Sequence, residues 1–351
     1  MIFPKEDFNK ASVKDANINK GILVDLFNKI DDDSINIHSM MLLKNGSRVF
    51  KASAYSFDED TKENVYSVSK AFTSIAIGIL IDKNLIKLDD YVLYFFKNEV
   101  NKYLKEYEQL KIKHLLTMSV PQTKDLFFEL DKMKNVIEPF FNQPLTAKLG
   151  EKFMYNNYAT FILSAIVSKV TNKSLNDFLN ENLYKIVGIK KPKWTEINNY
   201  SLGATELYIS ANDMARFGLL LLNDGQWNDS RIVSKDFLQE ATKLQIKTNY
   251  DDLNFDYDKY GYGYLFWLNS FGDFRASGSY QQHIVINKEY GLVFVLKAFE
   301  ERNLLSLFEN YVLKASEEGY NYCDYSLRDF IRRFKIHSKE IIEMEKNKSF
   351  E

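Results

Sequence analysis

The chain has 351 residues, of which 45% are hydrophobic, 27% charged and 15% aromatic. This composition is typical of a globular protein with a large core, and it excludes a disordered or fibrous chain. The formal net charge is -2, because 48 acidic residues nearly balance 46 basic ones, and the basic residues are scattered along the sequence. We therefore expect no nucleic-acid partner.

The sequence gives no sign of an oxidising compartment or of a membrane. Cys323, the one cysteine, cannot form an internal disulfide. The first residues lack a basic segment followed by an apolar core, so we expect no secretory signal. The longest apolar run, residues 71–81, is well short of the roughly 20 residues that a membrane helix needs. We expect a cytoplasmic protein with no membrane partner, and its oligomeric state stays open.

The first predicted elements are a β-hairpin and a long buried helix. Two β-prone runs, residues 35–43 and 48–54, flank Asn45-Gly46, a pair typical of a tight turn with positive φ. Residues 65–88 are apolar almost all round and contain no proline. This pattern predicts a central helix that is covered on most sides.

Helical patterns dominate the middle of the chain, and strand patterns return near its end. Helices are expected at residues 104–118, 153–170, 175–184, 211–223 and 235–244. Strands are expected at residues 262–269, 273–278, 282–287 and 292–299. Two further helices are expected at residues 304–313 and 328–346.

The order of these elements predicts an α+β fold. Two early strands and three or four late ones are most simply paired in one antiparallel sheet, with the helical block as an insertion. We expect an antiparallel sheet flanked by helices in a lobe made of residues 1–90 and 255–315. Residues 91–254 would form a mainly helical lobe, and residues 316–351 a charged, helical tail.

Ser67-Val68-Ser69-Lys70 is the first segment that could carry chemistry. A serine hydroxyl attacks poorly until a base takes its proton, and residues three apart share a helix face, so Lys70 would lie beside Ser67. An apolar helix around Lys70 would lower the pKa of its amine. If Ser67 opens the helix, its backbone N–H points outward, as an oxyanion donor should. The alternative is a capping serine beside a solvated lysine, because so short a motif recurs by chance.

The second segment is Tyr155-Asn156-Asn157. A tyrosine can act as a general base if nearby cations favour its phenolate, and Lys70 could supply that charge. Asn157 could hold the lysine and a substrate carbonyl together by hydrogen bonds. Taken alone, the segment is better explained by a Tyr and an Asn that cap the following helix, residues 158–170.

The third segment, Ala276-Ser277-Gly278-Ser279, stands at the end of a predicted strand. Gly278 would let a substrate approach the backbone closely, with Ser277 beside it. The Ser279 N–H would be the second oxyanion donor, paired with that of Ser67. The alternative is a plain strand end with a bulge.

Together and in this order, the three segments resemble the class C β-lactamase and penicillin-binding-protein-like serine hydrolases, a superfamily that includes family VIII esterases and nylon-oligomer hydrolases. The sequence around the motifs is similar as well, and the resemblance extends from about residue 37 to residue 313. The similar surrounding segments are residues 66–74, 113–119, 209–218 and 260–264.

The resemblance implies a β-lactamase/transpeptidase-like fold, with the site in the cleft between the sheet lobe and the helical lobe. It also implies an acyl-enzyme mechanism. Ser67 would attack a carbonyl carbon, Lys70 and Tyr155 would move the proton, and water would release the acyl group.

One departure from the family bears on the substrate. Ala276 stands where family members that bind β-lactams or D-alanyl peptides carry a Lys or His that helps recognise a carboxylate. Arg275 is adjacent, but successive strand residues face opposite sides, so it should point away. We expect weak β-lactam hydrolysis and a preference for other esters or amides.

Other chemistries find little support in the sequence. His38, His114, His283 and His337 are scattered, and no Cys or His cluster indicates a metal, so we expect no metal and no cofactor. No Gly-x-Ser-x-Gly elbow indicates a Ser-His-Asp triad.

The sequence therefore predicts a cytoplasmic serine hydrolase that cleaves small esters or amides through a Ser67 acyl-enzyme. A β-lactamase or D-amino-peptide hydrolase is the rival enzyme, and a non-catalytic ligand-binding module on the same fold is the rival from another class. The natural substrate stays open, with specificity expected at residues 121–143 and 250–264.

Overall fold

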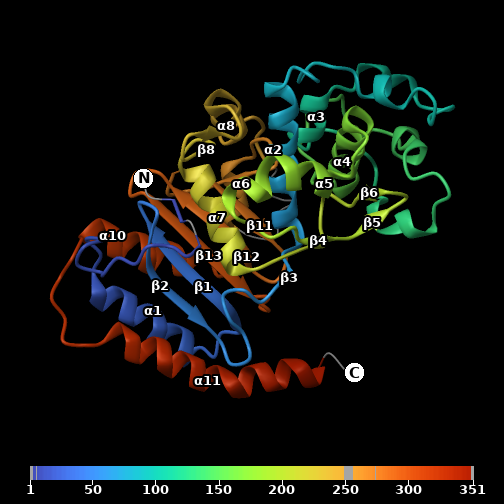
Figure 1. Ribbon diagram of the computed structural model, residues 1–351. Coiled ribbons are helices and arrows are strands. Elements are labelled where there is room, and N and C mark those ends of the chain that lie inside the picture. The colour runs from blue at the N-terminus through green and yellow to red at the C-terminus, as the bar shows by residue number, and fades with distance from the viewer. Residues whose placement is uncertain (1–2, 5, 249–255, 273, 349–351) are drawn as a thin grey trace. The chain divides into compact units, whose positions relative to one another are not determined.

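The computed structural model describes residues 3–4, 6–248, 256–272 and 274–348 (Figure 1). The chain forms two compact units. The first comprises Met1–Glu63, Ile209–Asn223 and Ser277–Glu351, and the second Asn64–Tyr208 and Asp224–Ala276. Residue 273 and residues 250–255, which begin the predicted strand 273–278 and the predicted specificity segment 250–264, lie outside the described residues. The lobe boundaries predicted from the sequence stay a prediction.

The first unit is built on antiparallel strands from both ends of the sequence. Neighbouring strands run in the order β12 (Gln282–Asn287), β13 (Leu292–Ala298), β1 (Ile37–Lys44) and β2 (Ser47–Ser53). The predicted hairpin is confirmed, because Asn45 and Gly46 turn between β1 and β2 with φ values of 51° and 83°. The early and late strands therefore share one antiparallel sheet, and the predicted α+β fold is confirmed.

Helices cover both faces of this sheet, which explains why nearly every residue of β1, β12 and β13 is buried. Helix α7 (Ala211–Leu222) contacts β1, β12 and β13 on one face, while α1 (Lys20–Asp32) and α11 (Leu327–Lys348) lie on the other (Figure 1). The chain between β13 and α11 has two short α-helical turns with a π-helix, Phe308–Leu313, between them. The α-helical turns are α9 (Leu305–Leu307) and α10 (Lys314–Glu318).

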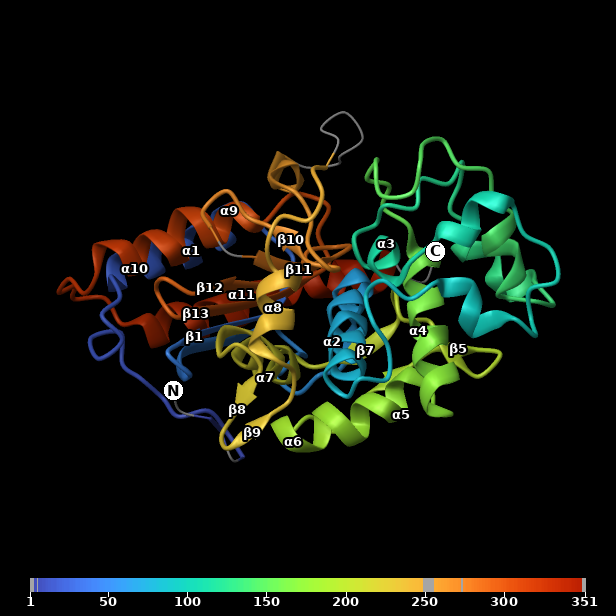
Figure 2. The ribbon, with the colours of Figure 1, turned by 90° about the horizontal axis from the view of Figure 1, so that it is seen from above.

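The second unit packs mainly helices around α2 (Ser69–Asp82). Every side chain from Ser69 to Leu80 is buried, as expected of a helix that is apolar almost all round. Helices α4 (Asn157–Thr171), α5 (Leu175–Leu179) and α8 (Lys235–Ala241) contact it, and Figure 2 shows α4 beside it. The other α-helices of the unit are α3 (Ile112–Leu116) and α6 (Lys185–Val187).

Short 3-10 and π turns and two-residue strands complete the second unit. The 3-10 and π turns are Tyr66–Val68, Val92–Phe96, Lys105–Gln109, Phe127–Lys132, Glu138–Asn142, Asn180–Tyr184 and Asp256–Tyr260. The short strands are β4 (Lys193–Trp194), β5 (Glu196–Ile197), β6 (Tyr200–Ser201), β8 (Gln226–Trp227), β9 (Ser230–Arg231) and β10 (Trp267–Leu268). Strands β3 (Glu63–Asn64), β7 (Leu207–Ile209) and β11 (Phe274–Gly278) run across the division between the units.

Several predicted elements are wrong in their extent. The central helix expected at residues 65–88 runs only from Ser69 to Asp82, after the 3-10 turn Tyr66–Val68, because Asn84 has a φ of 56° and cannot continue the helix. The expected helix 104–118 is divided into a 3-10 turn and α3, because Leu110 and Lys111 are extended and the Ile112 N–H donates to the Asp90 carbonyl instead of to its own helix. The expected strand 262–269 is reduced to β10, because Leu265 has a φ of 65° and breaks the extended run. Apolar periodicity registers none of these interruptions. Within the described residues, no helix is both long and apolar enough to cross a membrane.

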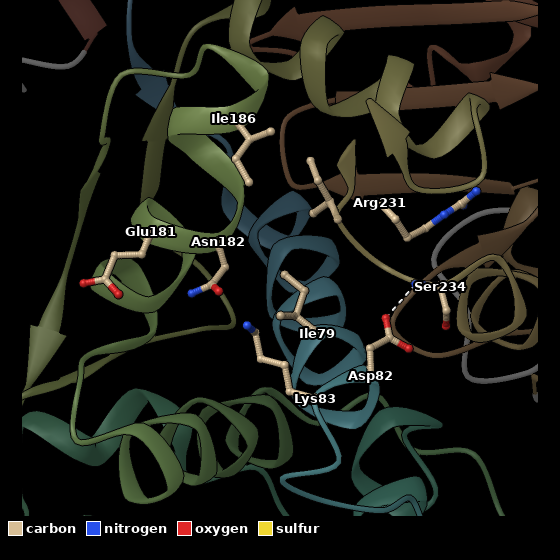
Figure 3. A pocket seen from close by; sticks show the side chains of 9 residues that line it. Ile79, Asp82, Lys83, Glu181, Asn182, Ile186, Arg231 and Ser234 are labelled. Atoms are coloured by element: carbon tan, nitrogen blue, oxygen red, sulfur yellow. Dashed lines mark hydrogen bonds between the residues drawn. The ribbon is translucent and has the colours of Figure 1, made fainter. Parts of the chain in front are cut away.

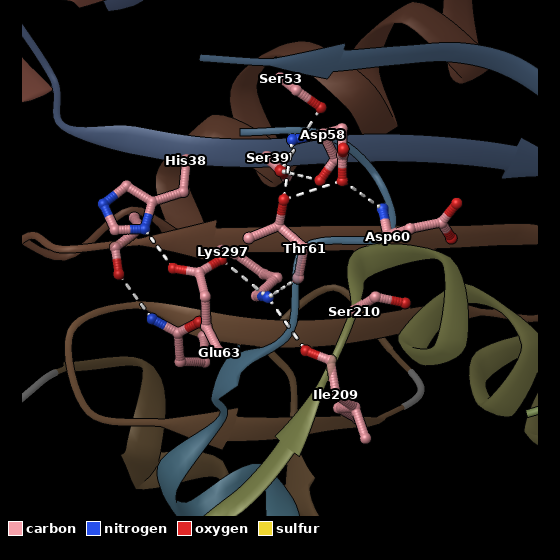
Figure 4. A network of polar contacts seen from close by, with 12 residues as sticks. His38, Ser39, Ser53, Asp58, Asp60, Thr61, Glu63, Ile209, Ser210 and Lys297 are labelled. Carbon is pink, nitrogen blue, oxygen red and sulfur yellow. Dashed lines mark hydrogen bonds and ion pairs between the residues drawn. The ribbon is translucent and has the colours of Figure 1, made fainter. Parts of the chain in front are cut away.

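A buried ionic network connects the last helix to the sheet of the first unit. Figure 4 shows three of its members, His38, Glu63 and Lys297. The two ring nitrogens of His38 on β1 lie 2.5 Å from the Glu63 carboxylate and 2.9 Å from that of Glu345 on α11. The Lys297 ammonium on β13 lies 2.8 Å from Glu63 and also donates to the carbonyls of Thr61 and Ile209. Burial alone would lower the pKa of His38, but its bonds to Glu345 and Glu63 outweigh that effect and raise the pKa to about 9.

This network makes part of the stability depend on pH. The folded pKa of His38, about 9, lies above the unfolded value of 6.5, so the stabilisation is present below pH 6.5 and is lost as the pH rises through 9. His38→Gln should therefore lower the free energy of unfolding more at pH 6 than at pH 10, by roughly 3 kcal/mol at most. Urea unfolding at the two pH values measures this difference. His337→Gln, which removes a more exposed histidine from α11, is the control. Equal losses for His38→Gln at both pH values would contradict this pH dependence.

Candidate active site

Ser67 lies in the turn that leads into α2. The 3-10 turn Tyr66–Val68 precedes the helix directly, and Tyr66 has a φ of 45°, which is rare for a large side chain. The Tyr66 N–H is held by the side chain of Asn64 at 2.8 Å. The chain therefore changes direction just before Ser67, and the helix begins just after it.

Lys70 stands in the first turn of α2, beside Ser67. Its side chain is 1% exposed, and its Nζ has three oxygen neighbours. Ser67 Oγ lies at 2.8 Å, Asn157 Oδ1 at 2.8 Å and the Ala204 carbonyl at 2.9 Å. The lysine is thus surrounded by hydrogen-bond acceptors, and no carboxylate touches its Nζ among the contacts of the described residues.

Burial without a direct counter-ion decides the protonation state of Lys70. Desolvation lowers the pKa of its amine to about 7, and the negative charge of Asp125 only partly opposes this. Near neutral pH a large share of the molecules therefore carries a neutral amine, which has two N–H groups and one lone pair. The oxygens of Asn157 and Ala204 can only accept, so they take the two N–H groups. The lone pair is left for the hydroxyl of Ser67.

The main-chain acceptor at Ala204 is held in place by its neighbour Gly203. Gly203 has a φ of 70°, and its carbonyl accepts a hydrogen bond from Thr73 on α2 at 2.9 Å. A Cβ on Gly203 would lie 2.9 Å from the Ser164 Cβ, because the segment is pressed against α4. A main-chain acceptor of this kind leaves no side-chain signal, so reasoning from the sequence did not find it.

Tyr155 precedes α4, close to both Ser67 and Lys70. Its hydroxyl is hydrogen-bonded to Ser67, its ring centroid lies 4.8 Å from Lys70 Nζ, and its ring stacks on Trp267 at 5.7 Å. Burial raises the pKa of the phenol well above its usual value, an effect that the bond to Ser67 opposes and that Asp258 adds to. Tyr155 therefore keeps its proton. Lys70, and not a Tyr155 phenolate, is the group able to accept a proton at neutral pH.

Asn157 is the first residue of α4, with Asn156 as the capping residue before it. The Asn156 side chain accepts from the Ala159 N–H, so Asn156 does the capping that the sequence left open for the whole segment. The Asn157 side chain does not cap the helix, and its Oδ1 accepts a hydrogen bond from Lys70. The structure places Ser67, Lys70, Tyr155 and Asn157 within one hydrogen-bonded group.

The third predicted segment is divided between the units: Ala276 ends the second unit, and Ser277, Gly278 and Ser279 belong to the first. Ser277 and Gly278 end β11, and Ser277 Oγ lies 2.9 Å from His283 Nδ1. Tyr280, which follows Ser279, has a φ of 56°. The substrate-binding roles of Ser277 and Gly278, and the pairing of the Ser279 and Ser67 N–H groups as oxyanion donors, stay predictions.

Arg275 is buried and its guanidinium is engaged within the second unit. It pairs with the Asp258 carboxylate, donates to Asn269 Oδ1 at 2.9 Å, and lies over the Trp267 ring at 5.7 Å. These contacts hold the cation against its own unit. Ala276, which stands where the resemblance places a substrate-binding Lys or His in related enzymes, carries no charge.

A cavity of about 420 Å³ lies at the other end of α2 (Figure 3). Ile79, Asp82 and Lys83 line it at the C-terminal end of the helix, far from Ser67 along the helix axis. The rest of its lining comes from Glu181, Asn182, Ile186, Arg231, Ile232 and Ser234. In the described ranges, no three His, Cys, Asp or Glu side chains gather closely enough to hold a metal ion.

Comparison with known proteins places the chain in a family. The family model described as Beta-lactamase matches residues 38–299. The chain belongs to the beta-lactamase family. The match includes all seven residues for which the sequence suggested a role, and it confirms the superfamily that the three motifs indicated.

Individual relatives of this beta-lactamase-family chain are distant. Protein flp of Staphylococcus aureus (strain MW2) is 25% identical over 46% of this chain, and the chain spans about a third of that relative's length, 35%. An uncharacterized protein of Alkalihalophilus pseudofirmus is 23% identical over 77% of this chain and 79% of its own length.

Solved structures share the fold at lower identity. A protein assigned as a 6-aminohexanoate-dimer hydrolase from Bacillus anthracis has a TM-score of 0.69 and 21% identity, covering 90% of this chain and 89% of its own. A family VIII carboxylesterase has a TM-score of 0.66 and 14% identity, covering 84% and 96%. The octameric penicillin-binding protein homologue from Pyrococcus abyssi has a TM-score of 0.65 and 18% identity, covering 84% and 77%.

The packing around Gly203 predicts a stability cost that a control can isolate. Gly203→Ala should destabilise the chain, because a Cβ there meets Ser164 and the residue must also keep a positive φ. Gly272→Ala carries only the second cost, since Gly272 has a φ of 79° and open space around it. We expect Gly203→Ala to lower the free energy of unfolding by about 1–3 kcal/mol more than Gly272→Ala does, as measured in urea. Equal losses would show that the segment is not tightly packed.

Proposed function

We propose that the chain is a cytoplasmic serine hydrolase that cleaves small esters or amides through an acyl-enzyme at Ser67. One observation carries the proposal: a buried lysine with a pKa of about 7 lies 2.8 Å from a serine hydroxyl. A serine becomes a useful nucleophile when an adjacent base can take its proton at the working pH. Lys70 meets that requirement.

The proposed acylation begins with the neutral Lys70 amine. Lys70 takes the proton from the Ser67 hydroxyl as Oγ bonds to the substrate's carbonyl carbon, and an oxyanion forms. The Ser67 N–H and, as the sequence predicts, the Ser279 N–H would donate to that oxyanion. The bond to the leaving group then breaks, and the leaving alcohol or amine receives the proton held by Lys70 through the neutral hydroxyl of Tyr155.

Deacylation reverses the same proton path. Water attacks the acyl carbon and passes a proton through Tyr155 to Lys70, which is again a neutral amine after the first half of the reaction. The bond from the acyl carbon to Ser67 Oγ breaks, Oγ recovers a proton from Lys70, and the acid leaves. Tyr155 serves as a relay in both halves because its raised pKa keeps its hydroxyl protonated at rest.

Neither Ala276 nor the adjacent Arg275 offers a cation to bind a substrate carboxylate, and this favours esters and amides whose binding does not depend on one. Ala276 carries no charge, and the adjacent Arg275 is engaged by Asp258 and Asn269. Two of the similar structures are named a carboxylesterase and a 6-aminohexanoate-dimer hydrolase, and those names fit an ester or amide substrate. We therefore propose that penicillins are poor substrates.

Two covalent probes test the proposal together. The protein is treated with a fluorophosphonate and with a labelled penicillin, and the adducts are weighed by mass spectrometry. We expect a fluorophosphonate adduct on Ser67. We expect neither a stable penicillin adduct nor hydrolysis of the penicillin. Adducts with both probes would favour the rival penicillin-recognising enzyme, and no adduct with either would favour a non-catalytic binding module.

Variants at Ser67 and in α2 sharpen this test. Ser67→Ala should remove fluorophosphonate labelling, while Ser74→Ala, which removes a buried hydroxyl from α2, should still be labelled at Ser67. Lys70→Met should slow labelling by a factor on the order of 10² to 10⁴, the usual contribution of a general base. Labelling that persists in Ser67→Ala, or nitrocefin turnover as fast as the best ester, would refute the assignment.

A further inference from the structure

Asp125 lies in the loop before the 3-10 turn Phe127–Lys132 and reaches the start of α4. Its Oδ2 accepts hydrogen bonds from the backbone N–H of Asn157 at 2.8 Å and from the Asn157 side-chain amide at 2.9 Å. Its Oδ1 accepts from the N–H of Tyr158 at 3.2 Å and from that of Phe127 at 3.0 Å. One carboxylate thus holds both the main chain and the side chain of Asn157.

These contacts determine which way the amide of Asn157 faces. A carboxylate only accepts hydrogen bonds, so the amide must present its NH2 group to Asp125. Its Oδ1 then points the other way, to Lys70 Nζ at 2.8 Å. With the amide reversed, an N–H group would face the amine, and the lone pair of a neutral Lys70 would be drawn toward Asn157 and away from Ser67.

We propose that Asp125 is a positioning residue that, acting through Asn157, directs the lone pair of Lys70 at the hydroxyl of Ser67. This role rests on the proposed function of Ser67 and Lys70 and deepens it. Asp125 does not touch Ser67 in any contact of the described residues. It holds the orientation of the Asn157 amide, and that amide in turn orients the amine of Lys70. The chain of contacts runs entirely within the second unit.

The charge of Asp125 supplies a signature that separates this role from simple helix capping. Among the described residues of the second unit, Tyr155 faces Lys70 directly, with its ring centroid 4.8 Å away, and Asp125 faces it from behind Asn157. Asp258 and Tyr262 face Tyr155 in turn. Asp125 holds the pKa of Lys70 up against the larger effect of burial. Removing its charge should therefore lower that pKa further.

The test measures fluorophosphonate labelling of Ser67 as a function of pH in the full chain. In the wild type the labelling rate should rise through about pH 7, as Lys70 loses its proton. In Asp125→Asn the inflection should move to lower pH by roughly half a unit or more, because a negative charge near the amine is gone. The plateau rate should fall at least about tenfold, because the new amide no longer fixes the orientation of Asn157. Asp131→Asn, an exposed carboxylate six positions along the same segment, should match the wild type.

A second variant, Asn157→Ala, tests the proposal if Asp125→Asn does not fold. Asn157→Ala leaves Asp125 bonded to the backbone N–H groups of residues 157 and 158, so the cap of α4 is retained. It should lower the plateau rate at least about tenfold relative to the wild type. Where Asp125→Asn does fold, the double variant should be no slower than Asn157→Ala, because the two residues act in series.

The outcomes separate this inference from the proposed function. A wild type that is not labelled at Ser67 overturns both. A labelled wild type whose rate and inflection are unchanged in Asp125→Asn, or an unchanged plateau in Asn157→Ala, overturns only the role of Asp125. A loss of thermal stability in Asp125→Asn with the wild-type pH profile would show that the carboxylate only caps the helix.

Discussion

The proposed chemistry depends on one physical constraint: the amine of Lys70 is buried among oxygens that accept hydrogen bonds but carry no full charge. Ser67, Asn157 and the Ala204 carbonyl satisfy its hydrogen bonds, yet none of them compensates the cost of keeping a positive charge away from water. The proton affinity of Lys70 falls as a result. A group that is a permanent cation on most protein surfaces becomes one that can take and return a proton near neutral pH.

A second buried lysine in the same chain makes the contrast clear. Lys297 in the first unit is also fully buried, and it too donates to two main-chain carbonyls. It differs in having the Glu63 carboxylate at 2.8 Å, and Glu63 opposes the effect of burial, which still lowers the pKa of Lys297. The presence of a carboxylate in direct contact marks Lys297 as part of an ionic network that holds the fold, and its absence marks Lys70 as a candidate base.

The sequence predicted the elements whose signal is local or strongly periodic. The Asn45-Gly46 turn and the late strands β12 and β13 were expected close to where the structure has them, and the apolar helix α2 was expected in the right place but too long at both ends. The motif order then indicated the family and brought together Ser67, Lys70, Tyr155 and Asn157, whose contacts the structure describes.

What the sequence could not supply depends on contacts between distant segments. Ala204 acts through its carbonyl, which every residue has, and Asp125 is indistinguishable in sequence from a surface carboxylate such as Asp131. The breaks at Leu110 and Leu265 arise from backbone angles that apolar periodicity does not register. From the sequence, a charged Lys70 was expected to favour the phenolate form of Tyr155. Burial instead disfavours the charged form of both side chains, so the phenol stays protonated and the amine is easily deprotonated.

The protonation of Lys70 in the resting protein is therefore the quantity to measure. Isotope-labelled lysine allows the side-chain signal of Lys70 to be followed by NMR from pH 5 to pH 10.5, and Lys70→Met identifies that signal by its loss. The account predicts an inflection near pH 7. An amine that stays protonated up to about pH 10, the ordinary range for lysine, would contradict it.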